Sequence, residues 1–137
     1  MQMYYPALAL VALTFAVWWR MFFSRLGQMR RERIHPQSVA LSAQMAARLS
    51  DSRAADNFRN LFELPVLFYA ALPLAVHLGE TDGAVLALAW VFVALRVVHS
   101  VIHCGYNKVM HRFYAYVGGG FALFALWGVL AWRMLVA

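Results

Sequence analysis

Two sets of polar side chains stand inside otherwise apolar stretches of this chain and could bind a charged ligand. In the first set, five residues recur at spacings of three and four: Arg53, Asp56, Asn57, Asn60 and Glu63. In the second set, the spacing is again helical: Arg96, His99, Ser100, His103 and Asn107. Such spacing places each set on one face of a helix. Guanidinium groups on these faces could hold carboxylates, and a carboxylate could hold an amine.

Charged residues are expensive inside a membrane, and those in these two sets need a reason. A charge at the bilayer centre costs roughly 2.5–3.5 kcal/mol on insertion scales. One interpretation is packing, in which Glu63 pairs with Arg96 and Asn60 hydrogen-bonds to a neighbouring helix. The other is a polar cavity that opens to the cytoplasm and binds a charged, water-soluble ligand. Ten polar positions on two faces are more than packing needs, and they favour the cavity.

The histidines of the second set do not predict a metal site. His99 and His103 are four residues apart, as in many metal-binding pairs on helices. However, the local motif has no carboxylate, and helical spacing turns Cys104 away from the face that carries both histidines. The chain also lacks the sequence motifs of common hydrolases, zinc proteases and nucleotide-binding loops. We therefore expect no metal.

The elements that must position these residues follow from the composition. Of the 137 residues, 64% are apolar and 13% are charged, whereas soluble domains are about 45–50% apolar and about 25% charged. This balance excludes an ordinary soluble domain and a disordered chain. A membrane-spanning helix needs roughly 20 apolar residues. We predict a single all-α transmembrane domain over residues 1–137, a four-helix bundle with spans at about 4–23, 60–78, 84–103 and 113–135.

The connections between the spans differ in character. Residues 24–59 form a basic connection in which residues 37–49 are expected to make a short helix. The helix of the second span is expected to begin near Ser52, with Ser50 or Asp51 as its N-cap, and to contain Pro65 and Pro73. A short acidic turn over residues 79–83 precedes the third span, and residues 105–108 separate the third span from the fourth.

Positive charge sets the expected orientation in the membrane. The chain has 12 Lys and Arg against 6 Asp and Glu, and most of the basic residues lie in connections beside apolar runs, so we expect no nucleic-acid partner. Basic connections stay in the cytoplasm. We therefore place residues 24–59 and 105–112 there, and both termini on the opposite side. Both polar sets then fall in the cytoplasmic half of the bilayer.

Two segments resemble the MAPEG family, the membrane-associated proteins in eicosanoid and glutathione metabolism. The first is Arg59-Asn60-Leu61-Phe62-Glu63-Leu64-Pro65, and the second is Arg96-Val97-Val98-His99-Ser100-Val101-Ile102-His103. The Asn-x-x-Glu pattern followed by Pro is typical of this family, and Arg-x-x-His is similar to its prostaglandin-forming branch. Length, four spans and a basic first connection extend the resemblance over the whole chain, as a bacterial-type member.

The resemblance implies a homotrimer in a bacterial inner membrane, with glutathione bound between adjacent subunits. Asn60 and Glu63 match residues that hold the backbone and amino group of glutathione. Arg112 matches an arginine that stabilises the thiolate in catalytic members, and it is the expected catalytic residue. The other positions expected to bind glutathione are Arg53, Arg96, His99, His103 and Lys108. Burial of the polar faces between subunits is a further reason to expect a trimer.

The implied activity is glutathione transfer to a lipophilic electrophile, or glutathione-dependent reduction of a lipophilic peroxide, with the acceptor entering from the bilayer lipid. Two positions depart from the pattern of catalytic members: Asp56 replaces an arginine and His103 replaces a tyrosine. The alternative is a non-catalytic membrane scaffold or lipid-binding protein that keeps the fold. Asn60, Glu63 and the arginines favour the enzyme, and Asp56 favours the alternative.

Overall fold

The computed structural model describes residues 2–81 and 83–136, and every regular element within these ranges is a helix. Met1, Ala137 and Asp82 of the expected acidic turn lie outside the described residues. In chain order the elements are α1 (Tyr4–Arg31), the 3₁₀ helix η1 (Pro36–Val39), α2 (Ser42–Arg48), α3 (Arg53–Asn60), α4 (Leu64–His77), α5 (Gly83–Cys104) and α6 (Val109–Val136).

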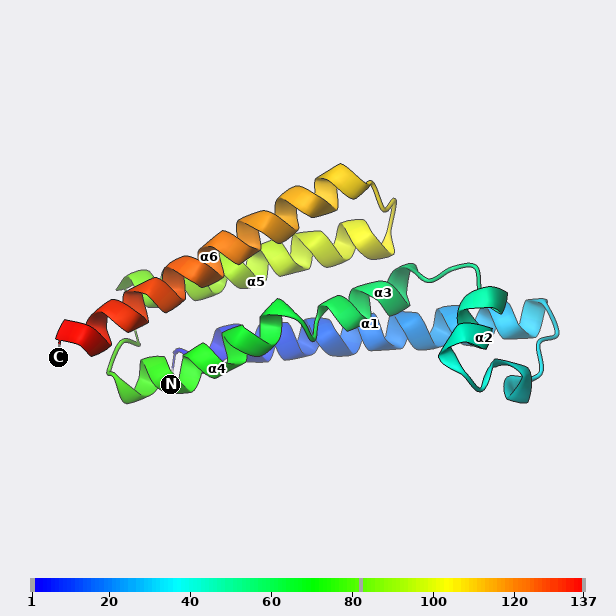
Figure 1. Ribbon diagram of the computed structural model, residues 1–137, viewed down its shortest axis with the longest axis horizontal. Coiled ribbons are helices and arrows are strands. Elements are labelled where there is room, and N and C mark those ends of the chain that lie inside the picture. Colours follow the sequence, from blue (N-terminus) through cyan, green and yellow to red (C-terminus); the bar gives the residue numbers. More distant parts are fainter. Residues whose placement is uncertain (1, 82, 137) are drawn as a thin grey trace.

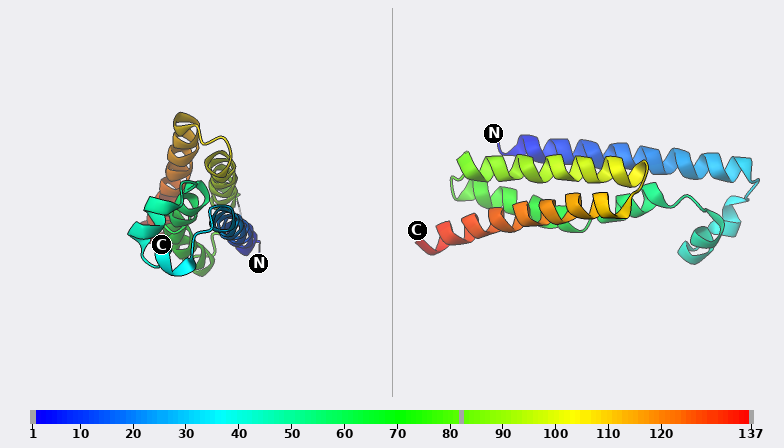
Figure 2. Two further views of the ribbon diagram at one scale, coloured as in Figure 1. Left: turned by 90° about the vertical axis from the view of Figure 1, so that its right-hand side faces the viewer. Right: turned by 90° about the horizontal axis from the view of Figure 1, so that it is seen from above.

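The long helices run alongside one another in an up-and-down bundle (Figures 1 and 2). α5 packs along α6, α1 packs against α3 and α5, and α4 packs against α6. Both termini lie at one end of the bundle. The opposite end carries the first connection and the turn between α5 and α6, and we call it the basic end. The two basic connections therefore share one end, as the alternation of spans predicts.

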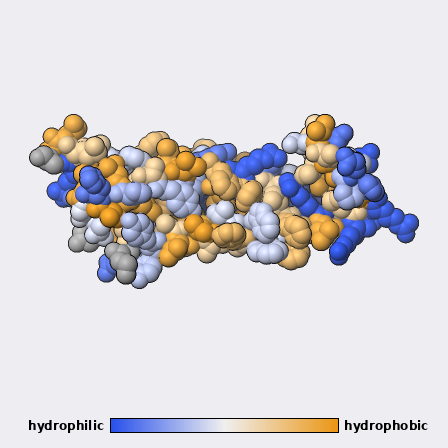
Figure 3. Space-filling model, turned by 90° about the horizontal axis from the view of Figure 1, so that it is seen from below, coloured by the Kyte–Doolittle hydropathy of each residue, from blue (hydrophilic) through white to orange (hydrophobic). Residues whose placement is uncertain are grey.

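Four helical segments of the described chain are long and apolar enough to cross a membrane: Tyr4–Arg31, Arg53–His77, Gly83–Cys104 and Val109–Val136. They overlap the four predicted spans, and the all-α membrane bundle is confirmed. α1 continues to Arg31, beyond the apolar run that ends near residue 23, because a helix can extend from the bilayer into water. Apolar surface dominates the middle of the molecule, and hydrophilic residues gather at the basic end (Figure 3).

The second span is interrupted, and the prediction of one continuous helix is wrong at this point. α3 ends at Asn60, residues 61–63 form a turn, and α4 begins at Leu64. Pro65 explains the interruption, because its ring would clash with the carbonyl of residue 61 in a continuous helix and it has no N–H to donate. In the first turn of α4 the same ring is well accommodated. Pro73 lies inside α4, as expected.

The first connection also differs from its expected form. η1 and α2 replace the single short helix over residues 37–49, because the backbone is extended at Leu41 (φ −99°, ψ 148°). Ser52 occupies the N-cap position of α3, so the expectation of Ser50 or Asp51 as the N-cap is wrong by one or two residues. The Asp51 carboxylate accepts hydrogen bonds from Arg53, and the Ser52 hydroxyl donates to Asp56 at 2.7 Å.

Small residues allow the helices of the bundle to approach closely. The rings of Phe68 on α4 and Phe92 on α5 stack with 4.8 Å between centroids, and both are fully buried. A Cβ built at Gly119 on α6 would lie 3.8 Å from side-chain atoms of both Phe92 and Leu95. The backbone of α6 thus lies directly against side chains of α5, a packing that small residues permit in membrane helices.

We expect Gly105→Ala to destabilise the turn between α5 and α6. A Cβ at this position would lie 2.7 Å from the carbonyl oxygen of Val101, which already accepts the Gly105 N–H at 3.0 Å. The clash should cost about 1–3 kcal/mol, the usual range for overpacking, and lower the unfolding temperature in detergent. Gly128→Ala is the control, because nothing lies within 4 Å of its added Cβ. Equal unfolding temperatures in the two variants would contradict the close contact.

Candidate functional site

A buried guanidinium connects α5 to the interrupted second span. The side chain of Arg96 on α5 is only 1% exposed. Its Nη1 and Nη2 donate to Oδ1 of Asn60, at 2.8 and 2.9 Å. Nδ2 of Asn60 in turn donates to Oε2 of Glu63 at 2.8 Å. Because Glu63 is exposed, these bonds form a chain from a buried cation to a surface carboxylate. We call these three residues the polar relay.

Aromatic rings complete the surroundings of Arg96. Its guanidinium carbon lies 5.0 Å from the ring centroid of Tyr116 and 5.9 Å from that of Phe92. The negative face of an aromatic ring attracts a cation at such distances. Tyr116, on α6, was not among the residues expected from the sequence. The signal that could have identified it is its position four residues after Arg112, which places both on one face of α6.

Next to the polar relay, three residues pack α3 against α5 through weak polar contacts. Oγ of Ser100 donates to Oδ1 of Asn57, and Nδ2 of Asn57 donates to Sγ of Cys104, both at 3.4 Å. Asn57 and Ser100 are buried. Asn57 and Ser100 therefore serve helix packing, the first of the two interpretations of the polar sets.

Two histidines place unpaired ring nitrogens inside the bundle. Nδ1 of His99 lies 3.0 Å from the carbonyl oxygen of Arg112, and since a carbonyl only accepts, Nδ1 carries the hydrogen. Nε2 of His99 and Nδ1 of His103 are buried and have no hydrogen-bond partner among the described residues. The two rings meet edge to face, with centroids 5.4 Å apart. Buried polar atoms are rarely unpaired, so these nitrogens are candidates to contact a ligand.

Arg112 lies at the start of α6, beside the histidines. Its backbone carbonyl meets His99, and its Nη1 donates to Oδ1 of Asn107 in the preceding turn at 2.6 Å. Asn107 has φ of 52°, a left-handed conformation that asparagine tolerates better than most residues. The guanidinium is half-buried and keeps further N–H groups besides the one on Asn107. Lys108 is exposed in the same turn.

Arg53 has a structural role at the basic end. Its Nε and Nη2 donate to the two carboxylate oxygens of Asp51 at 2.9 and 3.1 Å. Its Nη1 donates to the carbonyl oxygen of Gly105 at 2.7 Å. Arg53 thus ties the start of α3 to the turn after α5. The hydrogen bonds from Arg53 hold the pKa of the Asp51 carboxyl below its usual value.

The structure brings six of the expected site residues into one region between α3, α5 and α6. They are Asn60, Glu63, Arg96, His99, His103 and Arg112. The other two expected residues lie outside this region: Arg53 pairs with Asp51, and Lys108 is exposed in the α5–α6 turn.

Two expectations about the polar sets need correction. Glu63 and Arg96 do not pair directly, because Asn60 lies between them. Most of the second set is already buried within one chain, so burial of that face between subunits is no longer an argument for a trimer, whereas in the first set only Asn57 is buried. Within residues 2–81 and 83–136, no three His, Cys, Asp or Glu side chains are grouped to hold a metal ion.

Comparison with known proteins gives one match. The sequence model of the MAPEG family matches residues 3–132, which is nearly the whole chain and includes every residue of this region. No curated protein and no solved structure matches the chain.

We expect Asp51→Asn to lower stability in a pH-dependent manner. A carboxyl whose pKa is lowered on folding stabilises the fold above its unfolded pKa, about 3.8, and this contribution is lost as pH falls through the folded value. The partners are partly exposed, so the loss at neutral pH should be about 0.2–1 kcal/mol. Unfolding in detergent between pH 3 and pH 7 should therefore show the two proteins converging at acid pH. A constant difference across this range would contradict the role of the carboxylate.

Proposed function

This chain belongs to the MAPEG family, and from that membership and the polar relay we propose that it is a membrane-embedded, glutathione-dependent transferase or peroxidase. The family comprises membrane proteins of eicosanoid and glutathione metabolism, whose members generally use glutathione. The proposed acceptors are lipophilic electrophiles or peroxides that enter from the bilayer. The chain is an integral membrane protein, and we propose a bacterial inner membrane with both termini outside the cytoplasm.

The observation that carries the proposal is the polar relay. Glutathione has two carboxylates, an ammonium and a thiol, so its site needs an acid and several cations. Asn60 occupies one oxygen of Glu63, and the exposed carboxylate retains acceptor capacity for an ammonium group. The buried cation at the other end of the relay fixes the amide of Asn60 with its oxygen toward Arg96. The relay thus orients Glu63 before a ligand arrives.

The thiol of glutathione would lie near Arg112. A neighbouring cation lowers the pKa of a thiol and raises the fraction of thiolate, and arginine remains charged even when partly buried. In the transfer reaction the thiol proton leaves to solvent, and the sulfur electron pair forms a bond to an electrophilic carbon. A leaving group such as halide departs from that carbon with its bonding electron pair, or, in an addition, the electron pair of the opened C–O or C=C bond takes a proton from solvent. In the peroxide reaction two glutathione molecules are oxidised to the disulfide, while the peroxide is reduced to an alcohol and water. His99 contacts the backbone carbonyl of Arg112, and the unpaired nitrogens Nε2 of His99 and Nδ1 of His103 are buried beside it.

The assembly proposed for this chemistry is a homotrimer, with glutathione held between adjacent subunits in the cytoplasmic half of the bilayer. MAPEG proteins are typically oligomeric. Glu63 is exposed and Arg112 is half-buried on the single chain. A neighbouring subunit could therefore contribute further groups to a ligand that contacts both.

A specific observation supports a second candidate, a non-catalytic scaffold or lipid-binding protein. Asp56 stands where catalytic members carry an arginine, and its carboxylate pairs with Arg59 at 3.5 Å. Arg53 is also occupied, by Asp51. A carboxylate of glutathione would therefore have fewer free cations near the start of α3 than it has in catalytic members.

We expect Glu63→Gln to weaken glutathione binding by about tenfold or more. Hydrogen bonds to charged groups contribute roughly 1.5–3 kcal/mol, and each 1.4 kcal/mol corresponds to about tenfold in affinity. Isothermal titration of the detergent-purified protein measures the effect. Glu80→Gln is the matched control, because Glu80 pairs with Arg133 at the other end of the bundle. Unchanged affinity in a folded Glu63→Gln protein would remove Glu63 from the binding site and favour the scaffold.

We expect Arg112→Ala to raise the apparent pKa in the pH profile of kcat/KM with a soluble aromatic electrophile, and to reduce turnover at neutral pH. Without the cation the thiolate is less stable relative to the thiol, so the pKa of the bound thiol rises. Arg112→Lys should restore part of the pKa lowering and part of the turnover, because lysine returns the positive charge but not the planar guanidinium group. Arg133→Ala, at the far end of α6, is the control. A normal pH profile in Arg112→Ala would show that Arg112 only anchors the helix in the membrane.

A further inference from the structure

Two hollows follow one another along the side of α1 that faces α3, and we call this side the seam. The first, of about 440 Å³, lies at the basic end, where α2 and residues 49–52 also line it, and its wall is polar and apolar in equal parts; its charged residues are Arg25, Asp51, Asp56 and Arg59. The second, of about 360 Å³, is almost wholly apolar; Val11, Phe15, Trp18, Phe58, Phe62 and Tyr69 contribute to its wall. We call the first the polar hollow and the second the apolar groove.

Helical register shows that the two hollows belong to one surface. On α1, residues Val11, Phe15, Trp18 and Arg25 follow at intervals of four, three and seven, which places them on one face. On α3 and the turn after it, Arg59 of the polar hollow and Phe62 of the apolar groove are three residues apart. A ligand lying along this seam would therefore pass from polar to apolar surroundings without crossing a helix.

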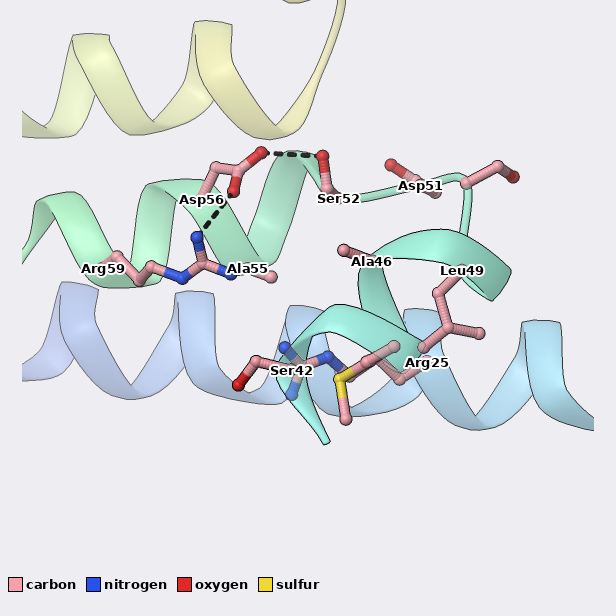
Figure 4. Close-up of a pocket in the computed structure, with 11 residues that line it drawn as sticks. Arg25, Ser42, Ala46, Leu49, Asp51, Ser52, Ala55, Asp56 and Arg59 are labelled. Atoms are coloured by element: carbon pink, nitrogen blue, oxygen red, sulfur yellow. Dashed lines mark hydrogen bonds and ion pairs between the residues drawn. The ribbon is translucent and has the colours of Figure 1, made fainter. Parts of the chain in front are cut away.

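The polar hollow presents one ion pair and one arginine outside it. Figure 4 shows Arg25 entering from α1, and Asp56 and Arg59 entering from α3. Asp56 accepts from Ser52 and pairs with Arg59. Arg25 is half-buried and has no ion-pair partner in the described part of the chain. Guanidinium groups suit a phosphate, while a carboxylate with nearby hydroxyls suits an ammonium group.

The length of the seam along the helix axis matches the thickness of one leaflet of a bilayer. Phe15 and Arg25 are ten residues apart, about 15 Å along a helix, and one leaflet is about half of a hydrocarbon core of about 30 Å. Trp18 and Trp19 lie between them, and tryptophan is enriched at the membrane interface. The polar hollow thus lies at headgroup level, and the apolar groove lies among the acyl chains.

We propose that this seam binds one phospholipid with a phosphate and a primary amine in its headgroup, of the phosphatidylethanolamine class. The phosphate lies against Arg25 and Arg59 and the ammonium group lies against Asp56, so the zwitterionic headgroup replaces the direct Asp56–Arg59 pair with one partner for each charge, and one acyl chain fills the apolar groove. A lipid with an anionic headgroup and no amine would leave Asp56 facing like charge. The apolar groove alone would fit a second copy of the chain equally well, but the charged hollow at its end favours an amphiphile. This site is separate from the polar relay and does not depend on the thiol chemistry.

Quenching of Trp18 fluorescence tests the proposal on the full chain in detergent. Phosphatidylethanolamine with brominated acyl chains should quench saturably, and the quenched fraction should fall in Trp18→Phe. Brominated phosphatidylglycerol should require about tenfold more lipid, because it loses a charge-assisted hydrogen bond. Arg25→Gln should weaken binding by a similar factor. Arg31→Gln, an exposed arginine near the end of the same helix, should leave it unchanged.

A second variant separates loss of the site from a general effect of charge. Ala46 lies on the wall of the polar hollow and is exposed, so Ala46→Phe should fill the hollow and weaken phosphatidylethanolamine binding without removing a cation. Equal, non-saturable quenching by both lipids in all variants would identify ordinary surrounding lipid and overturn the proposal. Quenching that is absent in a stable oligomer and appears on its dissociation would assign the seam to a second copy and overturn it as well.

Discussion

The buried guanidinium of Arg96 sets the constraint around which the centre of this bundle is built. A permanent cation inside a membrane protein needs hydrogen-bond acceptors and a polarisable environment, since its transfer to the bilayer centre costs several kcal/mol. Asn60 supplies the acceptor, and the rings of Tyr116 and Phe92 supply the environment. These partners come from α3, α6 and α5, so one charge fixes the relative positions of three helices.

The interruption of the second span, which Pro65 causes, lies directly beside this charge. The helix stops after Asn60, at the residue that receives Arg96, and restarts at Leu64 under the influence of Pro65. Irregular backbone at membrane depth is tolerated where it is buried in protein or lines a cavity. Here the turn of residues 61–63 carries Leu61 into the core and leaves Glu63 at the surface. The break thereby converts a polar stripe into a relay with a buried end and an accessible end.

The sequence predicted much of this architecture because its signals are local. Apolar run lengths determine the four spans, and the placement of arginine and lysine separates the two ends. The spacing of Asn60, Glu63, Arg96 and His99 identified the residues that gather. What could not be predicted depends on contacts between distant residues. The hydrogen bond between Asn60 and Arg96 joins positions 36 apart in the sequence. The packing of the Tyr116 ring against Arg96 was not predicted either.

The ion pair of Arg53 with Asp51 joins residues only two apart and was still not predicted, because either arginine of the α3 region could have faced the cavity. If the region between α3, α5 and α6 holds glutathione as a thiolate, ultraviolet difference spectroscopy of the detergent-purified protein should detect it. Free thiols of the cysteine type have a pKa of about 8.5. We expect a saturable thiolate absorption band on adding glutathione at pH 7. Saturable binding without that band would contradict the proposed chemistry, and the absence of binding would contradict the glutathione site itself.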